Sequence, residues 1–169
     1  MAHTVILITG GNRGLGLGLV KRFLARPNQT SQVVITPVRN PQHKTVKALG
    51  DLPKGEGSKL ILKEKHDIKH LDIVLANAGG GFVFPSVVEV KRSEIHDHME
   101  LNVYSVVSLY QATHDLLKES AGQAQFAIMG SSAGSLGYTP TGRAECGVWG
   151  SQVHTALVRS PYQRRGRVA

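Results

Sequence analysis

Four short apolar runs alternate with segments of helical spacing along the first 130 residues of this 169-residue chain. The runs are TVILIT (residues 4–9), QVVIT (32–36), LDIVLA (71–76) and QFAIM (125–129). Continuous apolar runs of this length are typical of parallel strands buried on both faces. Residues 17–25 have helical spacing, and a long helix is expected from an N-cap near Ser93, followed by Glu94, to about Gly122. The alternation predicts an α/β fold with a Rossmann-like, doubly wound parallel sheet.

A glycine-rich turn separates the first predicted strand from the first predicted helix. Glycine lets the backbone approach a pyrophosphate, and the free N–H groups at a helix start attract its negative charge. The spacing is T-G-x-x-x-G-x-G, which is weak by itself but is strengthened by the strand before it and the helix after it. We therefore predict a dinucleotide cofactor held by Thr9, Gly10, Arg13, Gly14, Leu15 and Gly16.

The end of the second strand indicates which dinucleotide this is. A site for NAD usually places an acidic residue there to bind the ribose hydroxyl, whereas residues 37–40 are PVRN. Arg39 and Arg13 supply two cations that suit a 2′-phosphate, so we expect NADP(H) as the cofactor. The alternative is that Arg39 is a solvated loop charge.

Small and polar residues follow the later predicted strands. Asn77 is able to hydrogen-bond backbone groups, and Ala78 and Gly79 leave room for a cofactor to lie close. Asn102 lies in the middle of the long helix, where asparagine is a poor helix former and invites a functional explanation. Ser131 follows the last strand at the carboxyl edge of the sheet, where ligands of open α/β sheets bind.

This ordered set of motifs resembles the short-chain dehydrogenase/reductases over about residues 3–142. The segments VRN (38–40), HLDIVLANAG (70–79) and QAQFAIMGS (123–131) are most similar to fungal norsolorinic-acid-type ketoreductases, which reduce ketones of aromatic polyketides in secondary metabolism. The resemblance implies that the glycine turn and residues 77–79 hold the cofactor. It implies that Ser131 hydrogen-bonds the carbonyl of a small ketone substrate, and that Asn102 anchors a water of the proton relay. It also implies a tyrosine proton donor with a lysine four residues on.

That tyrosine and lysine are not found. The tyrosine position falls at residues 144–146, which are Ala144, Glu145 and Cys146, and a lysine position four residues after Cys146 is Gly150. Cys146 lacks a lysine to organise it as a proton donor, so we favour an incidental or buried thiol. Three functions stay open: an NADP-dependent ketone reductase, a catalytically defective relative that at most binds cofactor, and a polyanion-binding protein acting through its basic end.

The sequence also predicts a shortened domain. KLIL (59–62) resembles a strand but ends eight residues before the strand at residue 71, and a parallel crossover needs about a dozen residues. We therefore expect residues 58–66 to form a short helix, and the later strands and helices of the family to be absent. Residues 1–142 are predicted as an incomplete NADP-binding domain. Residues 143–169 are predicted as a basic tail, with five basic residues and one acidic residue.

Composition restricts the partners and the location. The basic tail has no helical or zinc-finger pattern around its arginines, so no nucleic-acid partner is expected despite the net charge of +8. A single cysteine and the lack of a long apolar run favour a cytoplasmic protein without a membrane segment. His96 and His98 are spaced i, i+2 and do not face each other, so no metal is expected. The resemblance also implies a homodimer through the long helix and the tyrosine-bearing helix after it, but the sequence shows no clear pattern for that second helix.

Overall fold

The computed structural model describes residues 3–26, 31–62, 68–81, 83 and 85–131. Five strands form one sheet in the order β3-β2-β1-β4-β5, and every neighbouring pair is parallel. The strands are β1 (Thr4–Ile8), β2 (Gln32–Ile35), β3 (Lys59–Ile61), β4 (Ile73–Ala76) and β5 (Gln125–Ile128). The strand order reverses between β1 and β4, which places a ligand-binding switch point at their carboxyl ends. The predicted α/β class and parallel sheet are confirmed.

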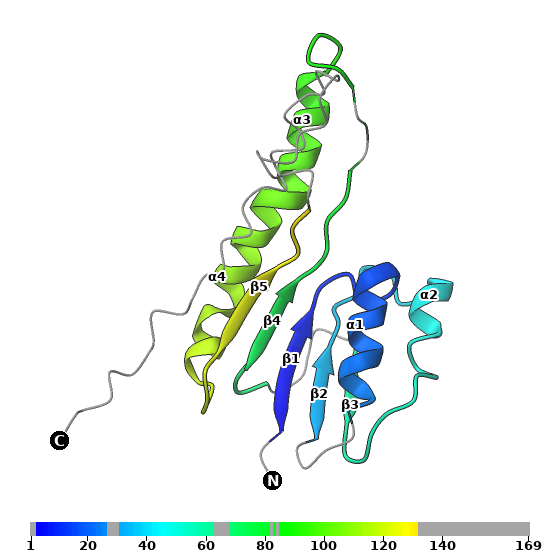
Figure 1. Ribbon diagram of the computed structural model, residues 1–169, viewed down its shortest axis with the longest axis vertical. Coiled ribbons are helices and arrows are strands. Elements are labelled where there is room, and N and C mark those ends of the chain that lie inside the picture. Colours follow the sequence, from blue (N-terminus) through cyan, green and yellow to red (C-terminus); the bar gives the residue numbers. More distant parts are fainter. Residues whose placement is uncertain (1–2, 27–30, 63–67, 82, 84, 132–169) are drawn as a thin grey trace, which may run out of the picture.

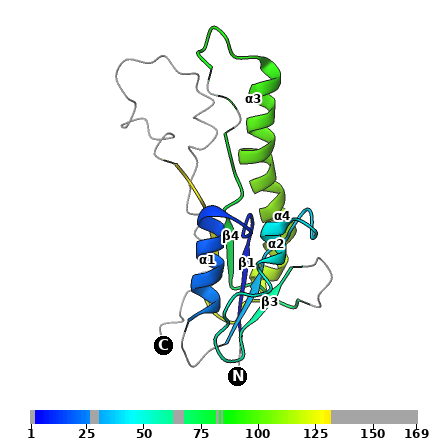
Figure 2. The ribbon, with the colours of Figure 1, turned by 90° about the vertical axis from the view of Figure 1, so that its right-hand side faces the viewer.

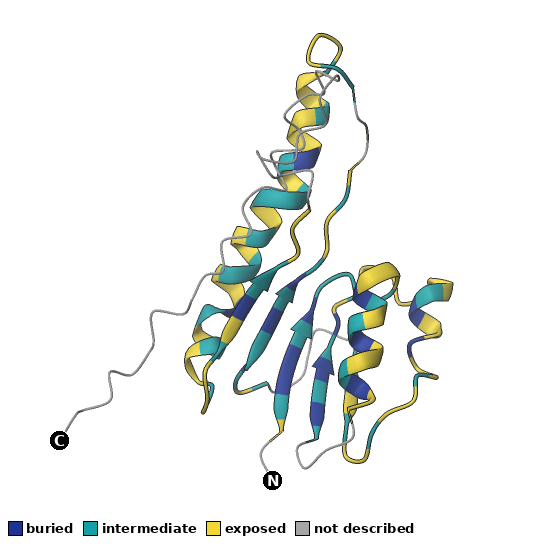
Figure 3. Ribbon diagram, viewed as in Figure 1, coloured by how far each residue is buried: buried dark blue, intermediate teal, exposed yellow. Residues whose placement is uncertain are grey.

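Helices cover both faces of the sheet (Figures 1 and 2). Helix α1 (Gly14–Leu24) packs on one face, where Ile6, Ile8 and Val34 are fully buried. Helix α4 (Ser105–Lys118) packs on the other face, against a cluster that includes Val74 and Phe126. Figure 3 shows this burial concentrated along the strands and on the inner sides of the helices. The structure is therefore doubly wound within the described residues.

The long predicted helix is continuous but changes its winding. It consists of α3 (Arg92–Met99), a π-helical segment η1 (Glu100–Tyr104) and α4, which ends at Lys118 rather than near residue 122. The helix begins at Arg92, close to the predicted start near Ser93, but its N-cap is Lys91, whose N–H donates to Glu94 Oε2 at 2.9 Å. In Figure 1 the α3 end of this helix extends well beyond the sheet.

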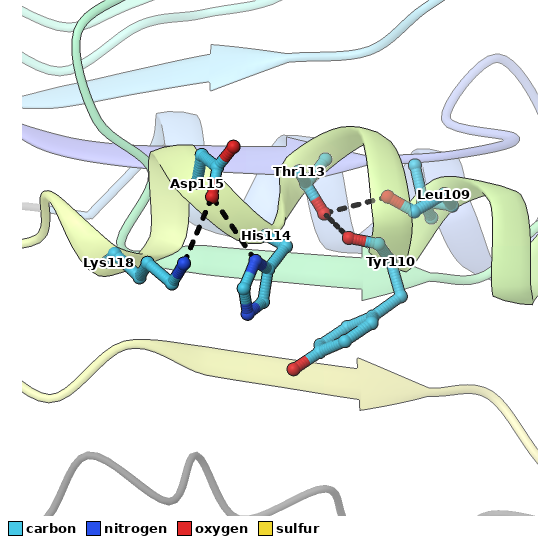
Figure 4. Close-up of polar contacts among 6 residues, drawn as sticks. All are labelled: Leu109, Tyr110, Thr113, His114, Asp115 and Lys118. Carbon is cyan, nitrogen blue, oxygen red and sulfur yellow. Dashed lines mark hydrogen bonds and ion pairs between the residues drawn. The ribbon is translucent and has the colours of Figure 1, made fainter.

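Side chains on α4 connect this helix to the sheet and to one another (Figure 4). Tyr110 meets Phe126 of β5 edge to face, with ring centroids 5.0 Å apart. The Thr113 hydroxyl donates to the Leu109 carbonyl of the preceding turn at 2.8 Å. The Tyr110–Phe126 contact lies on the face of α4 that covers the sheet, whereas the Thr113 bond stays within the helix.

The expected helix at residues 58–66 is wrong where the structure describes it, because Lys59–Ile61 is the edge strand β3. Its register with β2 is continued by Thr36, whose N–H donates to the Ile61 carbonyl at 2.9 Å. A crossover of a dozen residues is needed when it contains a helix, but extended chain advances about 3.3 Å per residue. The described residues between β3 and β4, 62 and 68–72, contain no helix.

Candidate functional site

The glycine turn after β1 is shaped by close contacts as well as by backbone conformation. Gly10 and Gly14 have positive φ angles of 66° and 53°, which side chains disfavour. A Cβ on Gly16 would lie 2.3 Å from the Gly10 carbonyl oxygen, and a Cβ on Gly11 would lie 2.1 Å from Thr36 Oγ1. Gly16 thus lets α1 begin directly against the turn. Sequence analysis missed Gly11, because its neighbour Thr36 comes from the next strand.

The start of α1 is open to an anion. Its N-cap, Arg13, is extended at φ −157° and ψ 169°, no side chain caps the helix, and its first turn has no acidic residue. Uncapped N–H groups and the helix dipole together favour a negatively charged group here. Leu15 in this first turn is 72% exposed, so the predicted phosphate-binding segment lies at the surface.

A second turn, after β4, is locked to the glycine turn by Thr9. The Thr9 side-chain oxygen accepts the N–H groups of Asn77 at 3.0 Å and Ala78 at 2.9 Å. In return, Asn77 Nδ2 donates to the Thr9 carbonyl at 2.9 Å. Two predicted cofactor residues, Thr9 and Asn77, therefore bind each other and hold the two turns side by side.

Asn102 has a specific partner in the same region. Its Oδ1 accepts the Gly80 N–H at 3.0 Å and its Nδ2 donates to the Gly80 carbonyl at 2.9 Å. It lies within the π-helical segment η1, a type of helix irregularity that is frequent at functional sites. The amide thus positions the loop after β4, and a Cβ on the neighbouring Gly79 would lie 3.1 Å from Asn102 Oδ1.

Arg39 and Ser131 follow other strands at the same edge of the sheet. Arg39 is exposed and lies in the loop after β2, which joins the sheet to the short helix α2 (Lys44–Lys47). Ser131 is exposed and follows β5, whose pairing with β4 continues through the Met129 N–H to the Ala76 carbonyl at 2.9 Å. Because parallel strands share a carboxyl edge, Ser131, Arg39 and the two turns lie along one side of the molecule. Cys146 and the other residues at the tyrosine and lysine positions lie outside the described residues.

Sequence analysis also missed three side chains around the Arg39 loop. Thr36 is fully buried and its hydroxyl donates to the Ile8 carbonyl at 2.8 Å. Asn12 Nδ2 donates to Thr45 Oγ1 at 2.8 Å. Asn12 sits inside the glycine motif, but no local signal indicates a partner 33 positions away.

The described residues were also compared with the requirements of a metal site and of a membrane-spanning helix. Among them, no group of three or more histidine, cysteine, aspartate or glutamate side chains lies close enough together to hold a metal ion. A search of their helices finds none with the length and apolar character that crossing a membrane requires.

Comparison with known proteins agrees with the geometry. Residues 4–142 match the family described as short chain dehydrogenase. The chain is 40% identical over 147 residues to a norsolorinic acid ketoreductase of Dothistroma septosporum, covering 76% of this chain and 53% of that protein. It is 36% identical over 146 residues to a norsolorinic acid ketoreductase of Aspergillus parasiticus, covering 76% of this chain and 52% of that protein. The chain thus spans about half the length of these relatives.

A solved structure extends the comparison to the fold. The carbonyl reductase Sniffer of D. melanogaster superposes with a TM-score of 0.73 at 26% sequence identity, covering 92% of this chain and 71% of that one. The family match over residues 4–142, the parallel sheet and the paired turns at its carboxyl edge lead to one conclusion: the chain belongs to the short-chain dehydrogenase family.

Proposed function

We propose that this chain is an NADP(H)-dependent oxidoreductase that binds its cofactor at the carboxyl edge of β1, β2 and β4 and reduces a ketone. The observation that carries the cofactor site is the pair of turns joined by Thr9 and Asn77 beside an uncapped helix start. Apart from its chain neighbours and the backbone of its own helix, no atom of the described residues lies within 4 Å of the Cβ position of Gly14, so the backbone at the start of α1 is bare and open to a dinucleotide. When bound, the nicotinamide supplies a hydride; residues of the turns hold and orient it.

The preference for the phosphorylated cofactor rests on charge. Arg13 is the N-cap of α1 and Arg39 is exposed in the loop after β2, both on the edge where the adenosine half of the dinucleotide would lie. Neither the first turn of α1 nor residues 36–43 contain an acidic side chain that would repel a 2′-phosphate. Guanidinium groups stay charged at all relevant pH values and bind phosphate through a fixed fork of N–H donors.

The substrate class follows from the relatives. Two norsolorinic acid ketoreductases are 36–40% identical to this chain, so we infer a ketone, such as a polyketide intermediate of fungal secondary metabolism. Ser131 would donate a hydrogen bond to the ketone oxygen, and Asn102 would keep the loop after β4 in place beneath the cofactor. The single cysteine supports a reducing, cytoplasmic location. No nucleic-acid or membrane partner is proposed.

A second candidate function is cofactor binding without turnover. It is favoured by the sequence after Ser131, in which no tyrosine is followed by a lysine four residues on. A free tyrosine titrates near ~10 and needs a neighbouring cation to act near neutral pH. The tyrosine position here holds Ala144, Glu145 and Cys146 instead.

Fluorescence titration of the purified chain with NADPH and NADH tests the proposal. Gly16→Ala places a methyl group 2.3 Å from the Gly10 carbonyl oxygen and is expected to abolish binding. Gly18 lies two residues further along α1, and nothing lies within 4 Å of its Cβ position. Gly18→Ala is therefore the matched control, which is expected to keep binding. A folded wild-type chain that binds neither dinucleotide would refute the cofactor site. Ketone reduction by the NADPH-bound chain then separates the two candidate functions.

A further inference from the structure

The loop that carries Arg39 is attached at both ends to the segment around the glycine turn. At its start, the buried Thr36 hydroxyl donates to the carbonyl of Ile8 at 2.8 Å, just before the turn begins. At its end, Thr45 Oγ1 accepts from Asn12 Nδ2 at 2.8 Å, inside the turn. Arg39 lies between the two attachments, and Arg13 directly follows Asn12. These two hydrogen bonds therefore connect the segments that carry Arg13 and Arg39, which are 26 positions apart in sequence.

The second attachment extends into a chain of hydrogen bonds. Thr45 Oγ1 lies 2.8 Å from His43 Nδ1, and the Thr45 N–H also donates to that nitrogen at 3.3 Å. Because the Thr45 oxygen accepts from Asn12, its own proton is directed to His43. We call Asn12, Thr45 and His43 the bridge. It runs from the glycine turn to the N-cap of α2.

The loop is also closed within itself. The Asn40 side chain accepts the Gln42 N–H at 2.9 Å, and the Asn40 carbonyl accepts the His43 N–H at 3.1 Å. The backbone that follows Arg39 is therefore a tight turn rather than a long free loop. Movement of this turn relative to Arg13 is opposed at one end by Thr36 and at the other by the bridge.

Phosphate binding by two arginines depends on their separation. An arginine fork gains most of its affinity from directed N–H bonds, and holding such groups in place beforehand reduces the cost of binding. We propose that the bridge is a positioning device for cofactor choice, which holds the Arg39 loop against Arg13 and so favours a 2′-phosphorylated dinucleotide over an unphosphorylated one. This inference rests on the proposed cofactor site. It assigns a role to Asn12, Thr45 and His43, none of which needs to touch the cofactor.

The test compares Thr45→Val, which keeps the shape and removes the hydroxyl, with Thr45→Ser, which restores it. Thr113→Val is the matched control, since that hydroxyl donates within α4, away from the turns. Dissociation constants for NADPH and NADH are measured by fluorescence titration, with circular dichroism as the check on folding. We expect Thr45→Val to weaken NADPH about fivefold, the loss of one hydrogen bond, and to change NADH by less than about twofold. Thr45→Ser and Thr113→Val should resemble the wild type.

A double-mutant cycle tests whether Thr45→Val weakens NADPH binding through Arg39. In an Arg39→Ala background, Thr45→Val should have no further effect on NADPH, because the group that the bridge positions is gone. Equal weakening of both dinucleotides, no weakening of either, or additive effects with Arg39→Ala would each overturn the proposal. Asn12→Ala breaks the bridge from the other side and should give the same selectivity change if Thr45→Val does not fold. A wild type that binds neither dinucleotide would instead refute the proposed cofactor site, and the bridge proposal with it.

Discussion

Replacing Gly11 by alanine is expected to destabilise the fold, because the new methyl group would clash with two buried side chains. The new methyl group would lie 2.1 Å from Thr36 Oγ1 and 2.9 Å from Val20 Cγ2. Both neighbours are fully buried, and the Thr36 hydroxyl is held by the Ile8 carbonyl at 2.8 Å. Neither side chain has room to withdraw without moving the end of β2 or the inner face of α1.

Two effects contribute to the loss in the free energy of unfolding that Gly11→Ala is expected to cause. Forcing an extra carbon into a packed core costs about 1–3 kcal/mol. Displacing the Thr36 hydroxyl leaves the Ile8 carbonyl without this donor, which costs about 1–3 kcal/mol when the group is buried. The surrounding residues can relax to relieve one cost at the expense of the other, so the two costs do not add in full. We therefore expect the free energy of unfolding to fall by roughly 2–4 kcal/mol. That is a large fraction of the roughly 5–15 kcal/mol that stabilises a typical domain.

Urea unfolding followed by circular dichroism measures this loss, and the midpoint should fall by roughly 1–2 M. Gly18→Ala, in α1, has open space around its Cβ and should be neutral or slightly stabilising. Thr36→Ala should partly relieve the clash, so the double variant should lose less than the sum of the two single variants. A loss below about 0.5 kcal/mol for Gly11→Ala, the range of ordinary surface changes, would refute the reasoning.

Three other changes test separate contacts. Asn102→Leu removes both bonds to Gly80 and should lower the free energy of unfolding by about 1–3 kcal/mol, with faster amide exchange at Gly80. Asp72→Asn should cost a similar amount, about 1–3 kcal/mol in the same urea assay, because the carboxylate accepts a main-chain N–H of β1 at 2.8 Å and a serine hydroxyl at 2.5 Å. The pKa of Asp115 is lowered chiefly by Lys118. The ionised carboxylate therefore stabilises the fold above the unfolded-state pKa, and this stabilisation is lost as pH falls through the folded-state pKa. Lys118→Met should move that pKa upward in an NMR titration, and an unchanged value would contradict the assignment.

Local signals were sufficient to predict four of the five strands of the sheet, and they indicated the glycine turn as a candidate site. The apolar runs at residues 4–9 and 71–76 and the glycines after them act over a few positions, so the sequence alone indicates a strand, a turn and a helix start. Asn102 was recognisable because asparagine is unfavourable within a helix, although its bonds to Gly80 were not. The edge strand Lys59–Ile61 was missed, because the length rule for crossovers between parallel strands was given more weight than the strand-like pattern of residues 59–62.

Long-range contacts account for what the sequence did not indicate. Gly11 needs to be glycine because of Thr36, and Asn12 is held by Thr45, 33 positions away. Both partners come from the segment around the end of β2, so their importance depends on the pairing of β1 with β2. Pattern and propensity describe neighbours along the chain, whereas these two pairs exist only once the sheet has formed.

Cofactor binding and turnover should be separable properties of this chain. The contacts that build the proposed cofactor site join residues 8–16, 36–45, 77–80 and 102, all before Ser131. The resemblance to the family implies a tyrosine for proton transfer at residues 144–146; if Cys146 occupies that position, the lysine position is Gly150. Introducing Cys146→Tyr together with Gly150→Lys should therefore raise ketone reduction while leaving the dissociation constant for NADPH within about twofold, since neither change removes a contact of the proposed cofactor site. A parallel change in both quantities would mean that the two halves of the site depend on each other.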